Sequence, residues 1–146
     1  MTIRITILIK RLPSVSEEDF HKYWSEKHAS LFLSVPIVQR NLRKYQQFHS
    51  DPIITGQLRQ VGLPLAEFDG GAELPRLAGR APGTPRPPRP RAGGPAVFQD
   101  GEYLRVVVPD EMKFLDREKA LMMIGTVEVK WEDGRPAEGI EVEGVK

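Results

Sequence analysis

Three side chains within the nine residues Phe20–His28 are the first candidates for chemistry. They are the phenol of Tyr23, the indole of Trp24 and the imidazole of His28, and they fall within three turns of an expected helix. Imidazole has a reference pKa of about 6.5, so it is well suited to exchange protons near neutral pH. The structural alternative is that His28 only makes a hydrogen bond within the fold, with Trp24 in the core.

A second group of candidates lies in residues 43–50, a stretch that is typical of a strand. Side chains alternate along a strand, so Tyr45 and His49 are expected on one face and Phe48 on the other. Several polar aromatics beside one apolar element can line a cavity as well as a core. The alternative for His49 is that it ends the strand and faces solvent.

The first group requires a helix, which is expected over residues 16–35. Ser16 is a suitable N-cap, and Asp19 three residues later can act as its acidic capping-box partner. Because His28 lies four residues after Trp24, it is expected on the buried face or at its rim. The apolar residues that mark this face at helical spacing are Phe20, Trp24, Leu31 and Val35.

The remaining elements predict the fold class. Residues 3–9 alternate four isoleucines with Arg4, Thr6 and Leu8, which is typical of a strand with one apolar face. The resulting βαββαβ order predicts an α+β, ferredoxin-like fold with a four-stranded antiparallel sheet and helices on one face. The uncovered face must also bury apolar side chains, so two copies are expected to pack sheet to sheet as a homodimer. Three more strands are expected, at 43–50, 65–74 and 121–130. A helical turn is expected at 37–42, a loop with a possible helical turn at 51–66, and a short helical piece at 109–116. Residues 98–107 are expected to form a helix that Pro109 stops, and a strand is the competing interpretation.

Composition narrows the possible classes. A chain of 146 residues predicts one domain with a single core. The absence of cysteine excludes disulfides and thiolate chemistry, and the three histidines form no metal-binding motif, so no metal is expected. No apolar run is long enough to cross a bilayer. The N-terminus has the alternation of a strand and no signal-peptide cleavage site, which favours a cytoplasmic protein without a membrane partner.

Residues 75–95 differ from the rest of the chain. They hold seven prolines and five arginines and no acidic residue. Because the whole chain has a net charge of +1, the residues outside this segment sum to −4. Basic charge confined to one such segment does not predict nucleic-acid binding. The segment is expected to be disordered, either as an insertion or as the product of a shifted reading frame or retained intron. An alternative is that the segment is an interaction module, because its P-x-x-P sequence, Pro85–Pro88, could bind SH3 or WW domains.

Several stretches together resemble the EthD-domain family, within the dimeric α/β-barrel superfamily. They are the N-terminal strand, residues 10–20, Tyr23-Trp24 with His28, residues 43–49, Phe68–Gly70 with Glu73, Glu102-Tyr103, and residues 108–116, which read V-P-D-E-M-K-F-L-D. The resemblance implies one domain over residues 1–130, interrupted at 75–95, with residues 131–146 as a tail or edge strand. It is strongest to small fungal proteins of polyketide gene clusters.

That branch implies a cofactor-free decarboxylase acting on an aromatic polyketide acid, such as an anthraquinone precursor like atrochrysone carboxylic acid. A dehydratase and a non-catalytic polyketide carrier are the alternatives. For decarboxylation, His28 or His49 would deliver the proton, and Tyr45 or Tyr23 would stabilise the oxyanion. Asp69 would orient a histidine, unless it belongs only to a turn or bulge. The apolar lining would come from Trp24 and Phe48.

Overall fold

The computed structural model describes residues 2–77 and 95–143 and centres on one antiparallel sheet. Its strand order is β2-β3-β1-β4, and every neighbouring pair is antiparallel. The strands are β1 (Thr2–Ile9), β2 (Gln46–His49), β3 (Gly70–Leu77) and β4 (Leu121–Val127). The predicted α+β fold with a four-stranded antiparallel sheet is confirmed.

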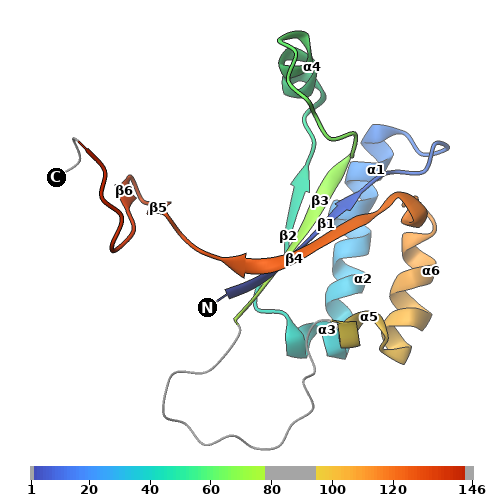
Figure 1. Ribbon diagram of the computed structural model, residues 1–146. Helices are drawn as coiled ribbons and strands as arrows, with labels where there is room; N and C mark the ends of the chain where they lie inside the picture. Colours follow the sequence, from blue (N-terminus) through green and yellow to red (C-terminus); the bar gives the residue numbers. More distant parts are fainter. Residues whose placement is uncertain (1, 78–94, 144–146) are drawn as a thin grey trace, which may run out of the picture.

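The helices that matter for the site cover one face of this sheet (Figure 1). In that view α1 and α2 run end to end and α6 lies beside them, whereas α4 projects away from the sheet. The helical segments are α1 (Glu17–Tyr23), η1 (Trp24–His28), α2 (Ala29–Ser34), α3 (Pro36–Asn41), α4 (Pro52–Gln60), α5 (Pro95–Phe98), η2 (Tyr103–Val107), α6 (Val108–Glu111) and η3 (Arg117–Lys119).

The segments α1, η1 and α2 follow one another directly and form the long helix predicted over residues 16–35. Ser16 caps it as expected, because its Oγ accepts a hydrogen bond of 3.1 Å from the Asp19 backbone N–H. The middle segment η1 is a π turn, which takes in one more residue than an α turn. Phe32 therefore occupies the buried position that α-helical spacing would give to Leu31, which is only half-buried.

The sheet turns one apolar face toward these helices. Ile5 and Ile9 of β1 are buried there, together with Leu74 and Ala72 of the neighbouring strand β3. The third strand was predicted five residues too early. Residues 65–69 are not in a strand, and β3 continues to Leu77 because β1 offers backbone partners along that whole length.

The strand β3 changes the interpretation of the Pro/Arg-rich segment at one end. Residues 75–77, which were assigned to that segment, pair with β1, with Pro75 opposite Arg4. At the other end, Pro95 opens the helix α5. The predicted disorder of residues 78–94 lies outside the residues that the structure describes.

The prediction that Pro109 stops the second helix is wrong. The helix continues through Pro109 as α6, directly after the π turn η2. In this turn the Val108 N–H bonds to the Tyr103 carbonyl, five residues earlier. The wider hydrogen-bond spacing of the π turn accommodates Pro109, which has no N–H to donate and whose ring would clash with the preceding turn of a regular α-helix. The extra turn carries Asp110 and Glu111 into the interior.

The C-terminal residues form a small hairpin apart from the main sheet (Figure 1). Its strands β5 (Trp131–Glu132) and β6 (Arg135–Pro136) pair only with each other, so this segment is a tail and not an edge strand. The predicted turn is confirmed, since Asp133 and Gly134 have φ values of 52° and 77°. Over the described parts of the chain, no helix combines the length and apolar character needed to span a membrane.

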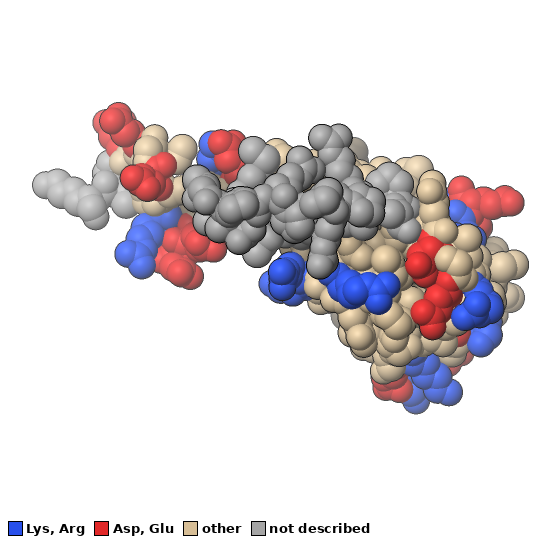
Figure 2. Space-filling model, turned by 90° about the horizontal axis from the view of Figure 1, so that it is seen from below, with Lys and Arg blue, Asp and Glu red and all other residues tan. Residues whose placement is uncertain are grey.

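Charge is mixed over the surface seen from below. Figure 2 shows Lys and Arg side chains interspersed with Asp and Glu at both ends of this face. This matches the near balance of 21 basic and 20 acidic residues in the sequence.

Replacing Gly70 with alanine is expected to lower the free energy of unfolding by about 1–3 kcal/mol. A Cβ atom there would lie 2.6 Å from both the Phe48 carbonyl oxygen and the Trp24 ring. The matched control is Gly71→Ala, where the nearest atoms are 3.6 Å away, and the change should stay within about 1 kcal/mol. Urea unfolding measures both variants, and equal losses would contradict close packing of Trp24 on Gly70.

Candidate functional site

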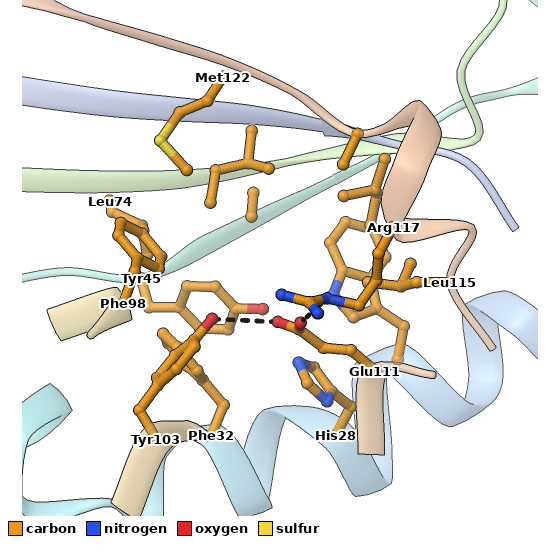
Figure 3. A pocket seen from close by; sticks show the side chains of 15 residues that line it. His28, Phe32, Tyr45, Leu74, Phe98, Tyr103, Glu111, Leu115, Arg117 and Met122 are labelled. Atoms are coloured by element: carbon orange, nitrogen blue, oxygen red, sulfur yellow. Dashed lines mark hydrogen bonds and ion pairs between the residues drawn. The ribbon is translucent and has the colours of Figure 1, made fainter. Parts of the chain in front are cut away.

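A cavity of about 140 Å³ lies between the sheet and the helices (Figure 3). The sheet contributes apolar side chains, among them Ile7, Leu74 and Met122, whereas the polar groups come mainly from the other elements. The polar residues that line the cavity are His28, Tyr45, Tyr103, Glu111 and Arg117.

His28 is a buried member of this lining, with 4% of its surface exposed. Its Nδ1 lies 2.8 Å from Oδ2 of Asp110, which is also buried. An ionised carboxylate can only accept, so Nδ1 carries the hydrogen and Nε2 is left to exchange a proton within the cavity. The Phe114 ring packs against the imidazole with a centroid distance of 4.9 Å, which fixes its plane.

Asp110 is the partner that orients His28. Its other oxygen accepts hydrogen bonds from Tyr23 Oη at 2.5 Å and from Lys113 Nζ at 3.2 Å. Burial by itself raises the pKa of Asp110, but the hydrogen bonds from Tyr23, His28 and Lys113 outweigh it and bring that pKa below its ordinary value. Asp110 therefore stays ionised at neutral pH and accepts the Nδ1 hydrogen of His28.

A second polar group faces His28 across the cavity. Figure 3 shows Glu111 above His28, bonded to Tyr103 on one side and to Arg117 on the other. The Tyr103 Oη donates to Glu111 at 3.1 Å, and Arg117 Nε lies 2.9 Å from Oε2. Burial raises the pKa of Glu111 more than its neighbours Arg117 and His28 lower it. Glu111 therefore takes up a proton more readily than Asp110, whose pKa is lowered.

Tyr45 lies on the sheet side of the same cavity. Its oxygen accepts a hydrogen bond of 3.0 Å from Gln47 Nε2, so its own hydrogen is available to a molecule in the cavity. Burial raises the pKa of Tyr45, and burial together with the Glu111 charge also raises that of Tyr103. Both phenols remain protonated at neutral pH and can act as hydrogen-bond donors.

The structure brings three of the predicted residues to the cavity, namely Trp24, His28 and Tyr45. Tyr23 does not line it, because its ring faces an outer groove and only its hydroxyl reaches inward, to Asp110. Tyr23 therefore holds Asp110 in the His28–Asp110 pair and does not itself line the cavity.

The structure does not bring His49, which was predicted to belong to the catalytic group, to this cavity. The strand alternation is as expected, with Tyr45, Gln47 and His49 on the helix side. The indole of Trp24 nevertheless packs against the His49 ring, at a centroid distance of 4.6 Å, and separates it from the cavity. His49 instead meets His21 at the surface, where burial and the nearby His21 lower the pKa of His49.

Two further site predictions are corrected. Asp69 does not orient a histidine, because both its oxygens bind Arg11, one at the backbone N–H and one at Nε. That ion pair, 3.2 Å long, holds the end of β1 to the start of β3. Phe48 is 69% exposed on the face of the sheet away from the helices, since it follows Gln47 by one residue.

The family model described as the EthD domain matches residues 12–118, which is most of the chain and includes the long helix, both π turns and every polar residue of the cavity. The chain belongs to the EthD domain family. A crystal structure of an EthD family protein from Bacillus halodurans C-125 is 16% identical, with 88% of this chain and 100% of that chain covered and a TM-score of 0.49. The comparison with curated proteins gives no match.

Four polar residues of this EthD domain were not predicted from the sequence: Asp110, Glu111, Tyr103 and Arg117. The signal for two of them was present, because adjacent acids follow Pro109 in the segment that resembles the family. Asp and Glu side chains are mostly exposed in folded proteins, so the sequence pattern alone assigns these two acids no role. Only the continuation of the helix through Pro109 turns them inward.

Replacing Asp110 with asparagine is expected to lower the free energy of unfolding at pH 7 by about 2–4 kcal/mol. The folded pKa of Asp110 is below its unfolded value of about 3.9, so its contribution is complete above that value and is lost as the pH falls through the folded pKa. The difference between wild type and variant should therefore shrink below about pH 4.

Urea unfolding at pH 7 and pH 3 tests this expectation. The control is Glu128→Gln, which removes an exposed ion pair with Lys130 and should cost less than about 1 kcal/mol. A loss in Asp110→Asn that is the same at both pH values would mean that its charge does not stabilise the fold.

Proposed function

We propose that this EthD domain is a cofactor-independent lyase that decarboxylates an aromatic polyketide carboxylic acid. The observation that carries the proposal is the buried His28–Asp110 pair beside a mainly apolar cavity. An imidazole held by an ionised carboxylate is a general acid and base for neutral pH.

Decarboxylation requires a place for the negative charge that the departing CO₂ leaves behind. The bond between the carboxyl carbon and the ring or α-carbon breaks, and its electron pair passes to that carbon and to a conjugated oxygen. Tyr45 and Tyr103 offer phenolic hydrogens to this oxygen, which stabilises the developing charge. Protonated His28 then gives its Nε2 proton to the carbon, and water returns a proton to His28.

The apolar walls support the first step. Ile7, Leu74 and Phe32 surround the carboxylate with groups that cannot hydrogen-bond to it, in place of its hydration shell. Arg117 is already paired with Glu111, so its charge is neutralised within the lining. Such surroundings favour neutral CO₂ over the carboxylate.

The cavity size indicates how a polyketide would bind. A volume of about 140 Å³ is close to the roughly 150 Å³ of an engineered apolar cavity that binds one benzene molecule. One carboxylated ring would occupy it, and the remaining rings would extend outward beneath the edge strand β4. Met122 lines the cavity from that strand and is 49% exposed, so the edge is open there.

Two other activities use the same residues differently. A dehydratase would use Glu111, with its raised pKa, to protonate a leaving hydroxyl group while His28 removes a proton from carbon. A non-catalytic carrier would need neither group, and the ionisable residues in the lining count against it. Product analysis separates them, since the three activities release CO₂, release water or return the ligand unchanged.

We also propose that the uncovered face of the sheet packs against a second copy of the chain. That face carries Leu8, Phe48, Leu121 and Met123, which alternate with the residues that face the helices. Phe48, Leu121 and Met123 are 69%, 58% and 68% exposed in the single chain. An apolar sheet face of this kind is normally covered, and a second sheet covers it with matching geometry.

The variant His28→Gln is expected to fold and to lose about 10²-fold or more in kcat, because glutamine cannot deliver a proton. The assay follows CO₂ release from one- to three-ring hydroxyaryl and β-keto carboxylic acids. His49→Gln is the matched control and should keep most of the wild-type kcat, since Trp24 separates that ring from the cavity. Normal turnover in His28→Gln, with an unchanged melting temperature, would make His28 a structural residue.

Replacing Met123 with aspartate is expected to convert the dimer to monomer, because it places a charge in the middle of the proposed interface. Sedimentation velocity at micromolar concentration measures the change. The control is Ile53→Asp on α4, a residue that is 72% exposed and lies outside the sheet. A wild-type protein that sediments only as a monomer would reject the interface.

A further inference from the structure

Two histidines outside the cavity converge at the surface. His21 lies in α1 and His49 ends β2, and their Nδ1 atoms are 2.7 Å apart. Two ring nitrogens at this distance can share one proton, or both can direct lone pairs at a third atom between them. Which of these they favour depends on the hydrogen bonds that the other ring nitrogens make.

The tautomer of His49 is set by Gln47. The Gln47 amide Nε2 donates to the Trp24 carbonyl at 2.9 Å and to Tyr45 Oη at 3.0 Å, so its Oε1 must be the acceptor. His49 Nε2 lies 3.1 Å from that Oε1 and therefore carries a hydrogen. Neutral His49 consequently presents the lone pair of Nδ1 toward His21.

His21 is left with an unsatisfied atom in this arrangement. Its Nε2 is buried and has no hydrogen-bond partner within residues 2–77 and 95–143. Glu17 Oε1, one turn earlier in the same helix, lies 3.8 Å away. If Nδ1 of His21 bound a cation, its hydrogen would move to Nε2, which could then donate to Glu17 after a small movement.

We propose that His21 and His49 bind a divalent transition-metal ion of the Cu²⁺ type through their Nδ1 atoms. Each imidazole would then have its other N–H directed at an oxygen acceptor, Gln47 for His49 and Glu17 for His21. Histidines that bind metals usually donate their other N–H in this way, which fixes the orientation of the ring. The arrangement also satisfies the buried Nε2 of His21.

The distance between the two nitrogens selects the geometry. Two ligands at about 2.0 Å and 90° are about 2.8 Å apart, as in the tetragonal sites of Cu²⁺ and Ni²⁺, whereas tetrahedral Zn²⁺ places them about 3.3 Å apart. From the observed 2.7 Å, the two nitrogens need to move less to reach the tetragonal spacing than the tetrahedral one. The remaining positions belong to water, because the described residues contain no group of three metal-binding side chains and His49 is exposed along a wide groove.

This site is separate from the proposed lyase chemistry. The Trp24 ring stands between His49 and the cavity, and His28 lies on the cavity side. Failure of the metal proposal would therefore leave the role of His28 untouched, and the reverse also holds.

Isothermal titration of the purified chain with CuCl₂ tests the proposal, with electron paramagnetic resonance to count coordinated nitrogens. Wild type is expected to bind one Cu²⁺ per chain with two imidazole nitrogens. His21→Ala and His49→Ala should each weaken binding by at least about tenfold and leave at most one nitrogen, whereas His28→Gln should bind like wild type.

A second pair of variants tests the hydrogen-bond acceptor of His21 and does not depend on removing a ligand. Glu17→Gln should weaken Cu²⁺ binding by about tenfold, and Glu18→Gln, the adjacent acid of the same turn, should not. Circular dichroism confirms that each variant is folded. Binding that is unchanged in both His21→Ala and His49→Ala, or a wild-type spectrum with no pair of imidazole nitrogens, would overturn the proposal. Tighter binding of Zn²⁺ than of Ni²⁺ would overturn the tetragonal geometry.

Discussion

The carboxylate of Asp110 joins the two helical segments that cover the sheet. It lies in α6, 3% exposed, and receives hydrogen bonds from Tyr23 and His28 of the long helix. A buried carboxylate is costly unless its lone pairs are used, and here three donors use them. The position of α6 against the long helix and the orientation of the His28 imidazole therefore depend on the same charge.

That arrangement depends in turn on two π turns. In the long helix, η1 keeps Trp24, His28 and Phe32 on the buried face. In the second helical segment, η2 precedes Pro109 and lets the helix continue far enough to turn Asp110 and Glu111 inward. Single π turns inside α-helices are uncommon and occur often at functional sites. Here both π turns supply residues to the same cavity, Trp24 and His28 from η1 and Tyr103 from η2.

The parts of the fold that follow from local patterns were predictable from sequence. The alternation in β1 and the Ser16 cap each depend on one element alone, and the structure agrees with both. The apolar stripe with His28 is also found, except that the π turn buries Phe32 in place of Leu31. The extent of β3 through Pro75 was not predictable in this way, because it depends on a partner strand far away in the sequence.

The site was predictable only in part, because some of its residues also depend on contacts between different elements. His28, Tyr45 and Trp24 could be found because each faces the interior of its own element. Whether His49 also reaches the cavity is decided by the indole of Trp24, which comes from another element.

Trp24 finally explains how His28 and the His21–His49 pair are kept apart on the same side of the sheet. Its indole fits against the sheet only because Gly70 has no side chain at the point of contact. The ring then closes one end of the cavity near His28 and supports His49 on its far side. The two groups remain linked by Gln47, which bonds to Tyr45 in the cavity, to the Trp24 carbonyl and to His49. The amide of Gln47 therefore leaves the Tyr45 hydrogen free for the cavity and, on the other side of the indole, holds the hydrogen of His49 on Nε2.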